Sequence, residues 1–167
     1  LVVDNVHPDS GNDIFVNWRD YYYNGTGSTL LLSALGEPTH TGDKSLLYSY
    51  NNFGSPYYSE AERVLGAGEQ DFTEAGVEIL TMYFYGMSTN TATTKEQLYV
   101  GLDDGGTYAE VRYGTQEGES ITDIQIEDWT EWNVALSDFT DVTLSSVDSL
   151  FVGFGSRSAS SAGGNGL

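Results

Sequence analysis

The chain has 167 residues, enough for one domain with a substantial hydrophobic core. It carries 25 Asp and Glu residues against 6 Lys and Arg, which gives a formal net charge of -19. That charge argues against nucleic acid and anionic membrane surfaces as partners, because both are bound through Lys and Arg. There is no cysteine, which excludes disulfides, zinc thiolate sites and thiol nucleophiles. No apolar run approaches the ~20 residues needed to cross a bilayer, so membrane insertion is not expected.

Alternation of apolar and polar residues runs through the chain and predicts strands. These stretches are rich in Val, Tyr, Phe, Leu and Thr and are bounded by Gly, Asn, Asp and Ser. In chain order the predicted strands span residues 45–50, 77–86, 96–102, 107–113, 131–136 and 149–155. Asp104, Gly105 and Gly106 tolerate a positive φ and predict a hairpin turn. No long stretch keeps a helical period, so residues 71–77 and 136–142 are expected to form single turns at most.

Many short strands joined by turns predict an all-β fold, a two-sheet antiparallel β-sandwich. In each strand the alternation assigns one set of side chains to the interior. The predicted core comprises Ile14, Phe15, Leu46, Ile79, Met82, Phe84, Leu98, Val100, Val111, Trp132, Val134, Leu150 and Val152.

The residues that carry acid–base or nucleophilic chemistry form no specific pattern. The only histidines are His7 and His40, and both lie in polar turns outside any nucleophile motif. With 25 acidic residues, many pairs of carboxylates fit a glycosidase arrangement equally well, so such pairs have no specificity. We therefore expect a protein that is not an enzyme.

Aromatic side chains give a candidate sugar site, because an exposed ring stacks on a pyranose while polar groups hold its hydroxyls. The predicted sugar-binding residues are Trp18, Tyr22 and Trp129. Trp129 and Trp132 lie an odd number of residues apart, so in a strand one is expected to face the core and the other solvent. The alternative is that most of these rings bury core or subunit-interface surface.

From residue 13 onward the order of motifs is similar to that of a known family. The segments are, in order, DIFVNWRDYYYNGTGS, HTGDKSLLYSYNN, YYSEAERVL, DFTEAGVEILTMYFYG, EQLYVGLDD, WTEWNVALSDF and SVDSLFVGFGSR, followed by GGNG. This order resembles the galactose-binding-like jelly-roll domains of the carbohydrate-binding-module type from large secreted bacterial proteins. The resemblance implies a jelly roll, an extracellular or cell-surface location and polysaccharide as a partner.

The resemblance also implies a structural Ca²⁺. Jelly rolls of this type commonly hold the ion between the chain start, a loop before an early strand, and the closing strand. On that basis the predicted ligands are Asp4, Thr41 and Asp43, and oxygen ligands of this kind suit Ca²⁺. The alternative is that these residues form turns.

The family closes with a strand directly after the GG-G segment, whereas here the sequence reaches Leu167 at that point. The stretch LVVDNV has the pattern of that closing strand. We therefore expect a sandwich one closing strand short, unless residues 1–6 of a neighbouring copy complement it. The predicted donor residues are Leu1, Val2, Val3, Asp4, Asn5 and Val6. The alternatives are one repeat of a tandem array, and a module in which LVVDNV is its own first strand.

The predicted layout is a terminal strand at residues 1–6, a jelly-roll domain at 7–155 and a Ser/Gly-rich tail or junction at 156–167. Two functions follow. The first is a structural subunit or repeat of an extracellular filament or surface layer, in which copies of the protein join head-to-tail by strand complementation. The alternative is a carbohydrate-binding module of a secreted polysaccharide-degrading protein. The pairing of residues 1–6, within their own domain or with another copy, distinguishes the two.

Overall fold

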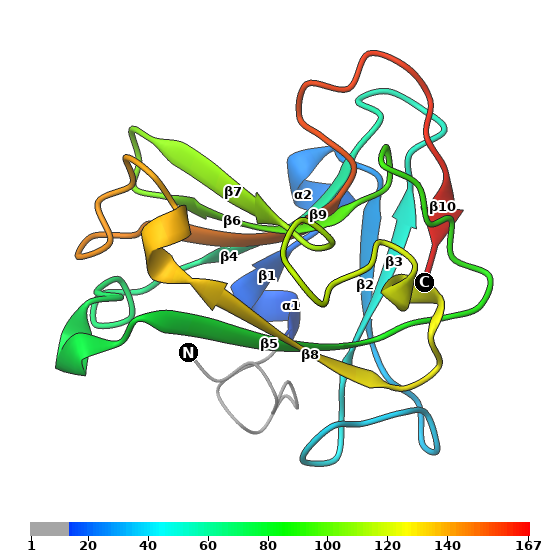
Figure 1. The fold of residues 1–167 in the computed structure, drawn as a ribbon, viewed down its shortest axis with the longest axis horizontal. Coiled ribbons are helices and arrows are strands. Elements are labelled where there is room, and N and C mark those ends of the chain that lie inside the picture. The colour runs from blue at the N-terminus through cyan, green and yellow to red at the C-terminus, as the bar shows by residue number, and fades with distance from the viewer. Residues whose placement is uncertain (1–13) are drawn as a thin grey trace.

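A computed structural model describes residues 14–167 and shows a nearly all-β protein (Figure 1). Its strands are β1 (Trp18–Arg19), β2 (Ser28–Leu32), β3 (Leu46–Asn51), β4 (Ser59–Val64), β5 (Ile79–Tyr85), β6 (Leu98–Asp103), β7 (Tyr108–Arg112), β8 (Trp129–Ala135), β9 (Ser149–Phe154) and β10 (Asn165–Gly166). Its short helical segments are α1 (Ile14–Asn17), α2 (Tyr21–Asn24), η2 (Glu74–Gly76), η3 (Asp123–Gln125) and η4 (Leu136–Asp138). The strands predicted from alternation are present as β3 and β5 to β9, with small shifts at their ends.

The strands form two packed layers. Five strands make the larger sheet, in the order β1-β4-β9-β6-β7. The second layer consists of two smaller sheets, β10-β3-β2 and the two-stranded ribbon β5-β8. Every pairing among the described strands is antiparallel. Interior side chains from all three sheets meet in one core, so the predicted antiparallel β-sandwich is confirmed.

Strand β5 illustrates how alternation decides burial. Leu80, Met82 and Phe84 pack against the core, whereas Ile79 is 53% exposed. Ile79 and Met82 are separated by an odd number of positions, so in a strand they face opposite sides. The prediction that Ile79 belongs to the core is therefore wrong.

The helical segments are single turns. α2 begins after Asp20, whose Oδ1 accepts a hydrogen bond from the Tyr22 amide at 3.1 Å. It ends at Gly25, whose φ of 71° is left-handed and suits glycine. η2 and η4 fall in the two stretches where the sequence predicts single turns. No helix within residues 14–167 is long and apolar enough to cross a membrane.

The Ser/Gly-rich tail, residues 156–167, returns to the domain and ends in β10 beside β3 (Figure 1). Asn90 holds the last residue from both sides. Its Nδ2 donates to the Leu167 carbonyl at 2.8 Å, and its Oδ1 accepts from the Leu167 amide at 2.7 Å. The predicted terminal strand, residues 1–6, lies outside the described residues, so the predicted layout at that end stays a prediction.

Candidate functional site

The outward side of the β5–β8 ribbon carries aromatic and polar side chains together. The two strands pair in antiparallel register, and residues that lie directly opposite one another share a face. The inward set includes Met82 opposite Trp132, which is 1% exposed. The outward set, which we term the β5–β8 outer face, comprises Thr81, Tyr83, Tyr85, Trp129, Glu131 and Asn133.

Four polar groups of the β5–β8 outer face are joined by hydrogen bonds. Thr81 Oγ1 donates to Asn133 Oδ1 at 2.7 Å, and Asn133 Nδ2 donates to Glu131 Oε1 at 2.6 Å. The Tyr83 hydroxyl donates to Glu131 Oε2 at 2.9 Å. Each polar group is therefore held in a fixed orientation while its residue stays exposed to solvent.

These hydrogen bonds also set the ionisation of the face. The hydrogen bond from Asn133, followed by that from Tyr83, lowers the pKa of Glu131 below its ordinary value. The same carboxylate raises the pKa of Tyr83. At neutral pH the face therefore presents an ionised acceptor at Glu131 beside a protonated phenol.

Rings from two strands and one loop gather at one end of this face. His40, from the loop between β2 and β3, stacks on Tyr83 with ring centres 3.8 Å apart and an interplanar angle of 18°. Trp129 meets His40 edge-on at 5.3 Å and Tyr85 edge-on at 5.6 Å. Because Tyr83, Tyr85 and Trp129 come from paired strands, the ribbon fixes their relative positions, and the loop adds His40 from outside.

A groove of about 610 Å³ opens beside these rings and reaches between the two layers. Its lining includes His40, Tyr83 and Trp129 together with interior residues of β3, β5, β6 and β9. The interior residues are mainly apolar, and Leu46 and Val100 are examples. One cavity therefore connects the aromatic face with the hydrophobic core.

The groove lies where the second layer is interrupted. Strand β2 pairs with one edge of β3 along its whole length, whereas β10 pairs with the other edge only at Asn51 and Tyr50. Along Leu46 to Ser49 this second edge has no strand partner among residues 14–167. In the same described range β5 pairs with β8 alone. Among residues 14–167, therefore, no strand fills the place between β3 and β5.

Trp18 is not the exposed sugar platform that the sequence predicts. Its side chain is 4% exposed and lines the groove from the interior. The reason is that β1 pairs with β4, opposite Arg63, and this pairing turns Trp18 inward and the next residue outward. The Trp18 indole Nε1 has no hydrogen-bond partner within the described part of the chain.

Tyr22 is 80% exposed, but it belongs to a different part of the surface from Trp129. It lies in α2 and contacts Tyr23 edge-on at 5.3 Å. It is not among the residues that line the groove, whereas Trp129 is. The predicted sugar-binding residues are therefore not brought together, and Trp129 alone lies on the β5–β8 outer face.

Sequence reasoning missed most of the residues that surround Trp129. Tyr83 and Glu131 were available as alternate positions of two predicted strands, on the side opposite Met82 and Trp132. Tyr83 and Glu131 lie side by side because the two strands pair, and the sequence does not show that pairing. His40 reads as an ordinary turn residue in the sequence, and nothing local indicates that its ring stacks on a strand.

The predicted calcium ligands are only partly placed. Thr41 and Asp43 lie in the loop between β2 and β3, and Asp4 lies outside the described residues. Between residues 14 and 167 there is no group of three or more His, Asp or Glu side chains arranged to hold a metal. The predicted calcium site, which includes Asp4, therefore stays a prediction.

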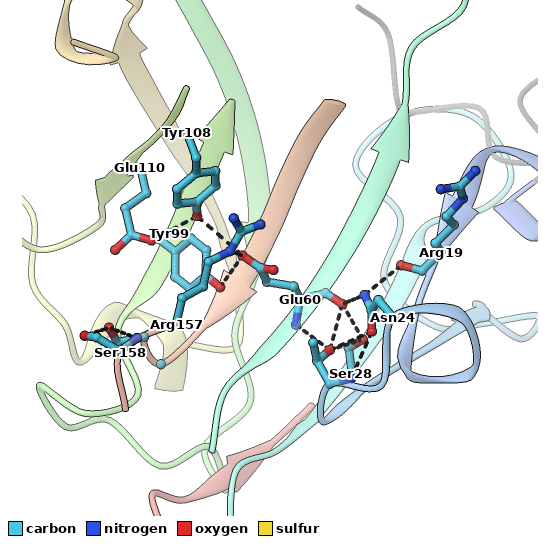
Figure 2. Close-up of polar contacts among 12 residues, drawn as sticks. Arg19, Asn24, Ser28, Glu60, Tyr99, Tyr108, Glu110, Arg157 and Ser158 are labelled. Atoms are coloured by element: carbon cyan, nitrogen blue, oxygen red, sulfur yellow. Dashed lines mark hydrogen bonds and ion pairs between the residues drawn. The ribbon is translucent and has the colours of Figure 1, made fainter. Parts of the chain in front are cut away.

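A second polar cluster lies on the outward side of the five-stranded sheet (Figure 2). Glu60 of β4 is 3% exposed, and its Oε1 accepts hydrogen bonds from the Tyr99 hydroxyl at 2.8 Å and the Tyr108 hydroxyl at 3.4 Å. It also accepts from Arg157 Nε at 2.7 Å. The guanidinium carbon of Arg157 lies 3.6 Å from the centre of the Tyr108 ring and 4.5 Å from that of Phe151.

This second cluster fastens the tail to the sheet. Burial, reinforced by the charge of Glu60, raises the pKa of Tyr99 and of Tyr108, so both hydroxyls stay protonated donors. The backbone carbonyl of Glu60 accepts further hydrogen bonds from Asn24 and Ser28 side chains (Figure 2). Since Arg157 belongs to the tail, the enclosed Glu60 carboxylate anchors residues 156–167, and it has little room to meet a ligand.

No protein-family model matches the chain, and no curated protein matches it. Among solved structures the chain is similar to a carbohydrate-binding module, CBM28, described as specific for non-crystalline cellulose. The TM-score is 0.47 and the sequence identity 10%, over 93% of this chain and 84% of that module. At this identity the cellulose specificity is a property of that module alone.

Proposed function

We propose that the protein is a non-catalytic module that binds polysaccharide through the β5–β8 outer face. The observation that supports the proposal is that rings and fixed polar groups share one accessible face. Trp129, Glu131 and Asn133 occupy alternate positions of one strand, opposite Tyr85, Tyr83 and Thr81. We further propose an extracellular or cell-surface location, because the ligand is an extracellular polymer.

A sugar chain makes use of both features of this face. Its pyranose rings have apolar faces that stack on Trp129 or Tyr85, and its hydroxyls donate to the Glu131 carboxylate and exchange hydrogen bonds with Asn133. A neutral polymer also suits a protein with a formal net charge of -19, because it brings no charge to be repelled.

The test is affinity electrophoresis through gels that contain a panel of soluble neutral polysaccharides. We expect at least one polysaccharide to retard the protein, and we expect Trp129→Ala to abolish the retardation. Tyr22→Ala is the matched control, because Tyr22 is an exposed ring outside the groove and the outer face. Circular dichroism of both variants checks that the fold is kept. Failure of the whole panel to retard the wild-type protein would contradict the proposal.

We infer a second function, head-to-tail assembly by strand complementation, and a specific observation favours it. One edge of β3 is paired by β10 at only two residues, and the rest of that edge runs along an apolar groove. A strand inserted there buries apolar side chains, each worth roughly 1.5–3 kcal/mol. It also gains backbone hydrogen bonds of about 0.5–1.5 kcal/mol each, against several kcal/mol of association entropy.

Light scattering after size-exclusion chromatography tests the assembly. We expect the 167-residue chain to form species larger than one copy in a concentration-dependent way, and a chain of residues 7–167 to stay monomeric. Added LVVDNV peptide should raise the thermal unfolding midpoint of residues 7–167 without restoring the larger species. A full chain that remains a single copy at all concentrations would contradict assembly while leaving the polysaccharide proposal intact.

A further inference from the structure

The geometry of β10 defines the direction and register of a strand that would fill the gap that residues 14–167 leave between β3 and β5. Asn165 lies opposite Asn51 and Gly166 lies opposite Tyr50, in antiparallel pairing. A strand that continues along this line after Leu167 runs down the unpaired part of the β3 edge. Its first three residues then lie opposite Tyr48, Leu47 and Leu46.

The side chains of β3 fix what this strand has to carry. Tyr48 and Leu46 pack against the core and line the groove, so residues directly opposite them also point into the groove. A residue opposite Leu47 points to the other side, away from the core. A strand placed here therefore requires apolar residues opposite Tyr48 and Leu46, and it accepts a β-branched residue opposite Leu47.

We propose that this position is filled by residues 1–6 of a second copy, with Leu1 opposite Tyr48, Val2 opposite Leu47 and Val3 opposite Leu46. The inference rests on the proposed assembly and specifies its contact. Among the 13 residues outside the described range, LVV is the one run of apolar strand-forming residues. Its length matches the short stretch of β3 edge that β10 leaves unpaired.

The composition of the next residues agrees with this register. In this register Asp4 falls opposite Ser45, and alternation places its side chain on the same outward side as that of Val2. Residues 7–13 then link the donated strand to α1 of the donor, which begins at Ile14. Each copy in this arrangement accepts a strand beside its own β10 and donates its first residues to the next copy.

A disulfide trap tests the register directly, because the chain contains no cysteine of its own. The variant carries Val2→Cys together with Leu47→Cys, two positions that the proposal places opposite each other on the outward side. Opposite Cα atoms in an antiparallel pair lie about 4.5–5.5 Å apart, within the range that a disulfide spans. We expect mild oxidation to give a ladder of covalent oligomers on a non-reducing gel, which collapses to one band on reduction.

The matched control pairs Leu47→Cys with Val3→Cys, which the proposal directs to the opposite side of the strand. We expect at least a several-fold weaker ladder from this control. A ladder that is equally strong in the control overturns the register. Assembly seen by light scattering without a ladder from Val2→Cys and Leu47→Cys also overturns the register, and leaves assembly standing.

Two other outcomes distinguish the source of the strand. A disulfide formed within one chain, seen as a faster-migrating monomer, overturns the second copy as donor and assigns residues 1–6 to their own groove. If the variant gives no ladder and light scattering shows no larger species, both this inference and the proposed assembly are overturned. As a further arm, Val3→Asp in the full chain should prevent assembly, because it places a charge in the apolar groove, whereas Val2→Asp should permit it.

Discussion

At the residue scale, burial separates two glutamates that look alike in the sequence. Glu60 is 3% exposed and is enclosed by donors from three other elements. Glu131 is exposed and holds its hydrogen bonds along the surface of a strand. The first therefore stabilises the fold and the second remains accessible to a ligand. Alternation predicts that one of Trp129 and Trp132 faces the core and the other solvent; Trp132 is 1% exposed in the core, whereas Trp129 lies on the outward side and is half-buried.

Replacing Glu60 by Ala should destabilise the fold by about 3 kcal/mol, because it leaves the Arg157 guanidinium and the buried Tyr99 hydroxyl without their acceptor. Chemical denaturation monitored by tryptophan fluorescence measures the loss. Arg19→Ala is the control, since Arg19 is 52% exposed and lies 3.7 Å from Glu62. Its removal should change the free energy of unfolding by no more than about 1 kcal/mol. Equal, small losses in both variants would show that the Glu60 cluster does not fasten the tail.

At the element scale, the β6–β7 hairpin is specified by its turn residues. Asp104 Oδ1 accepts from the amides of Gly106 and Thr107, and its Oδ2 accepts from the Thr143 amide. The same carboxylate therefore shapes the turn and ties it to the loop before β9. The sequence predicts the turn, whereas the contact with Thr143 depends on the packing of a distant loop.

These hydrogen bonds, the one from Thr143 first, lower the pKa of Asp104 to about 2. The ordinary value is about 3.9, so the unfolded chain takes up this proton at a higher pH than the folded chain does. The stabilisation by Asp104 is therefore complete above about pH 4 and is lost as the pH falls towards 2. Asp104→Asn should be less stable than wild type at pH 6, and the difference should shrink as the pH approaches 2.

Urea denaturation at both pH values measures this difference. Glu117→Gln, at an exposed position in the loop after β7, is the control and should track wild type throughout. If the free energy of unfolding of Asp104→Asn lies below that of wild type by the same amount at pH 6 and at pH 2, the charge of the carboxylate does not contribute to stability.

Strands with a clean alternation were predictable, and two elements without it were not. β4 is not among the predicted strands, and three of its residues, Glu60, Glu62 and Arg63, are charged. The burial of Glu60 depends on a tyrosine and an arginine supplied by other parts of the chain. The three tyrosines of α2 were assigned to no element from the sequence, and the Asp20 cap with the left-handed Gly25 makes them a helical turn.

At the scale of the whole molecule, the interrupted second layer and the high negative charge have opposite effects on the association of copies. The part of the β3 edge that has no partner among residues 14–167, together with the apolar groove, favours contact with another strand. A formal net charge of -19 on each copy opposes close approach. Motif order alone led to the prediction that residues 7–167 lack a closing strand, whereas the gap itself is seen only among the strands of residues 14–167. Its place between β3 and β5, with β10 leading into it, required the fold, because that position is made by segments far apart in the sequence.

The two proposed surfaces meet at the groove but use different sides of the second layer. Polysaccharide contacts the outward residues of β5 and β8, whereas the donated strand fills the layer itself and buries its inward side chains. The central claim is that the β5–β8 outer face is where the ligand binds. It can be tested without assembly by using the chain of residues 7–167.

The most direct measurement is a nuclear magnetic resonance titration of ¹⁵N-labelled protein with a soluble oligosaccharide of the polysaccharide that retards it in gels. The account predicts that the amide shifts concentrate in residues 81–85 and 129–133, with the Trp129 indole signal among the largest. Shifts concentrated instead around α2 or around the Glu60 cluster of the five-stranded sheet, with residues 81–85 and 129–133 unmoved, would contradict it.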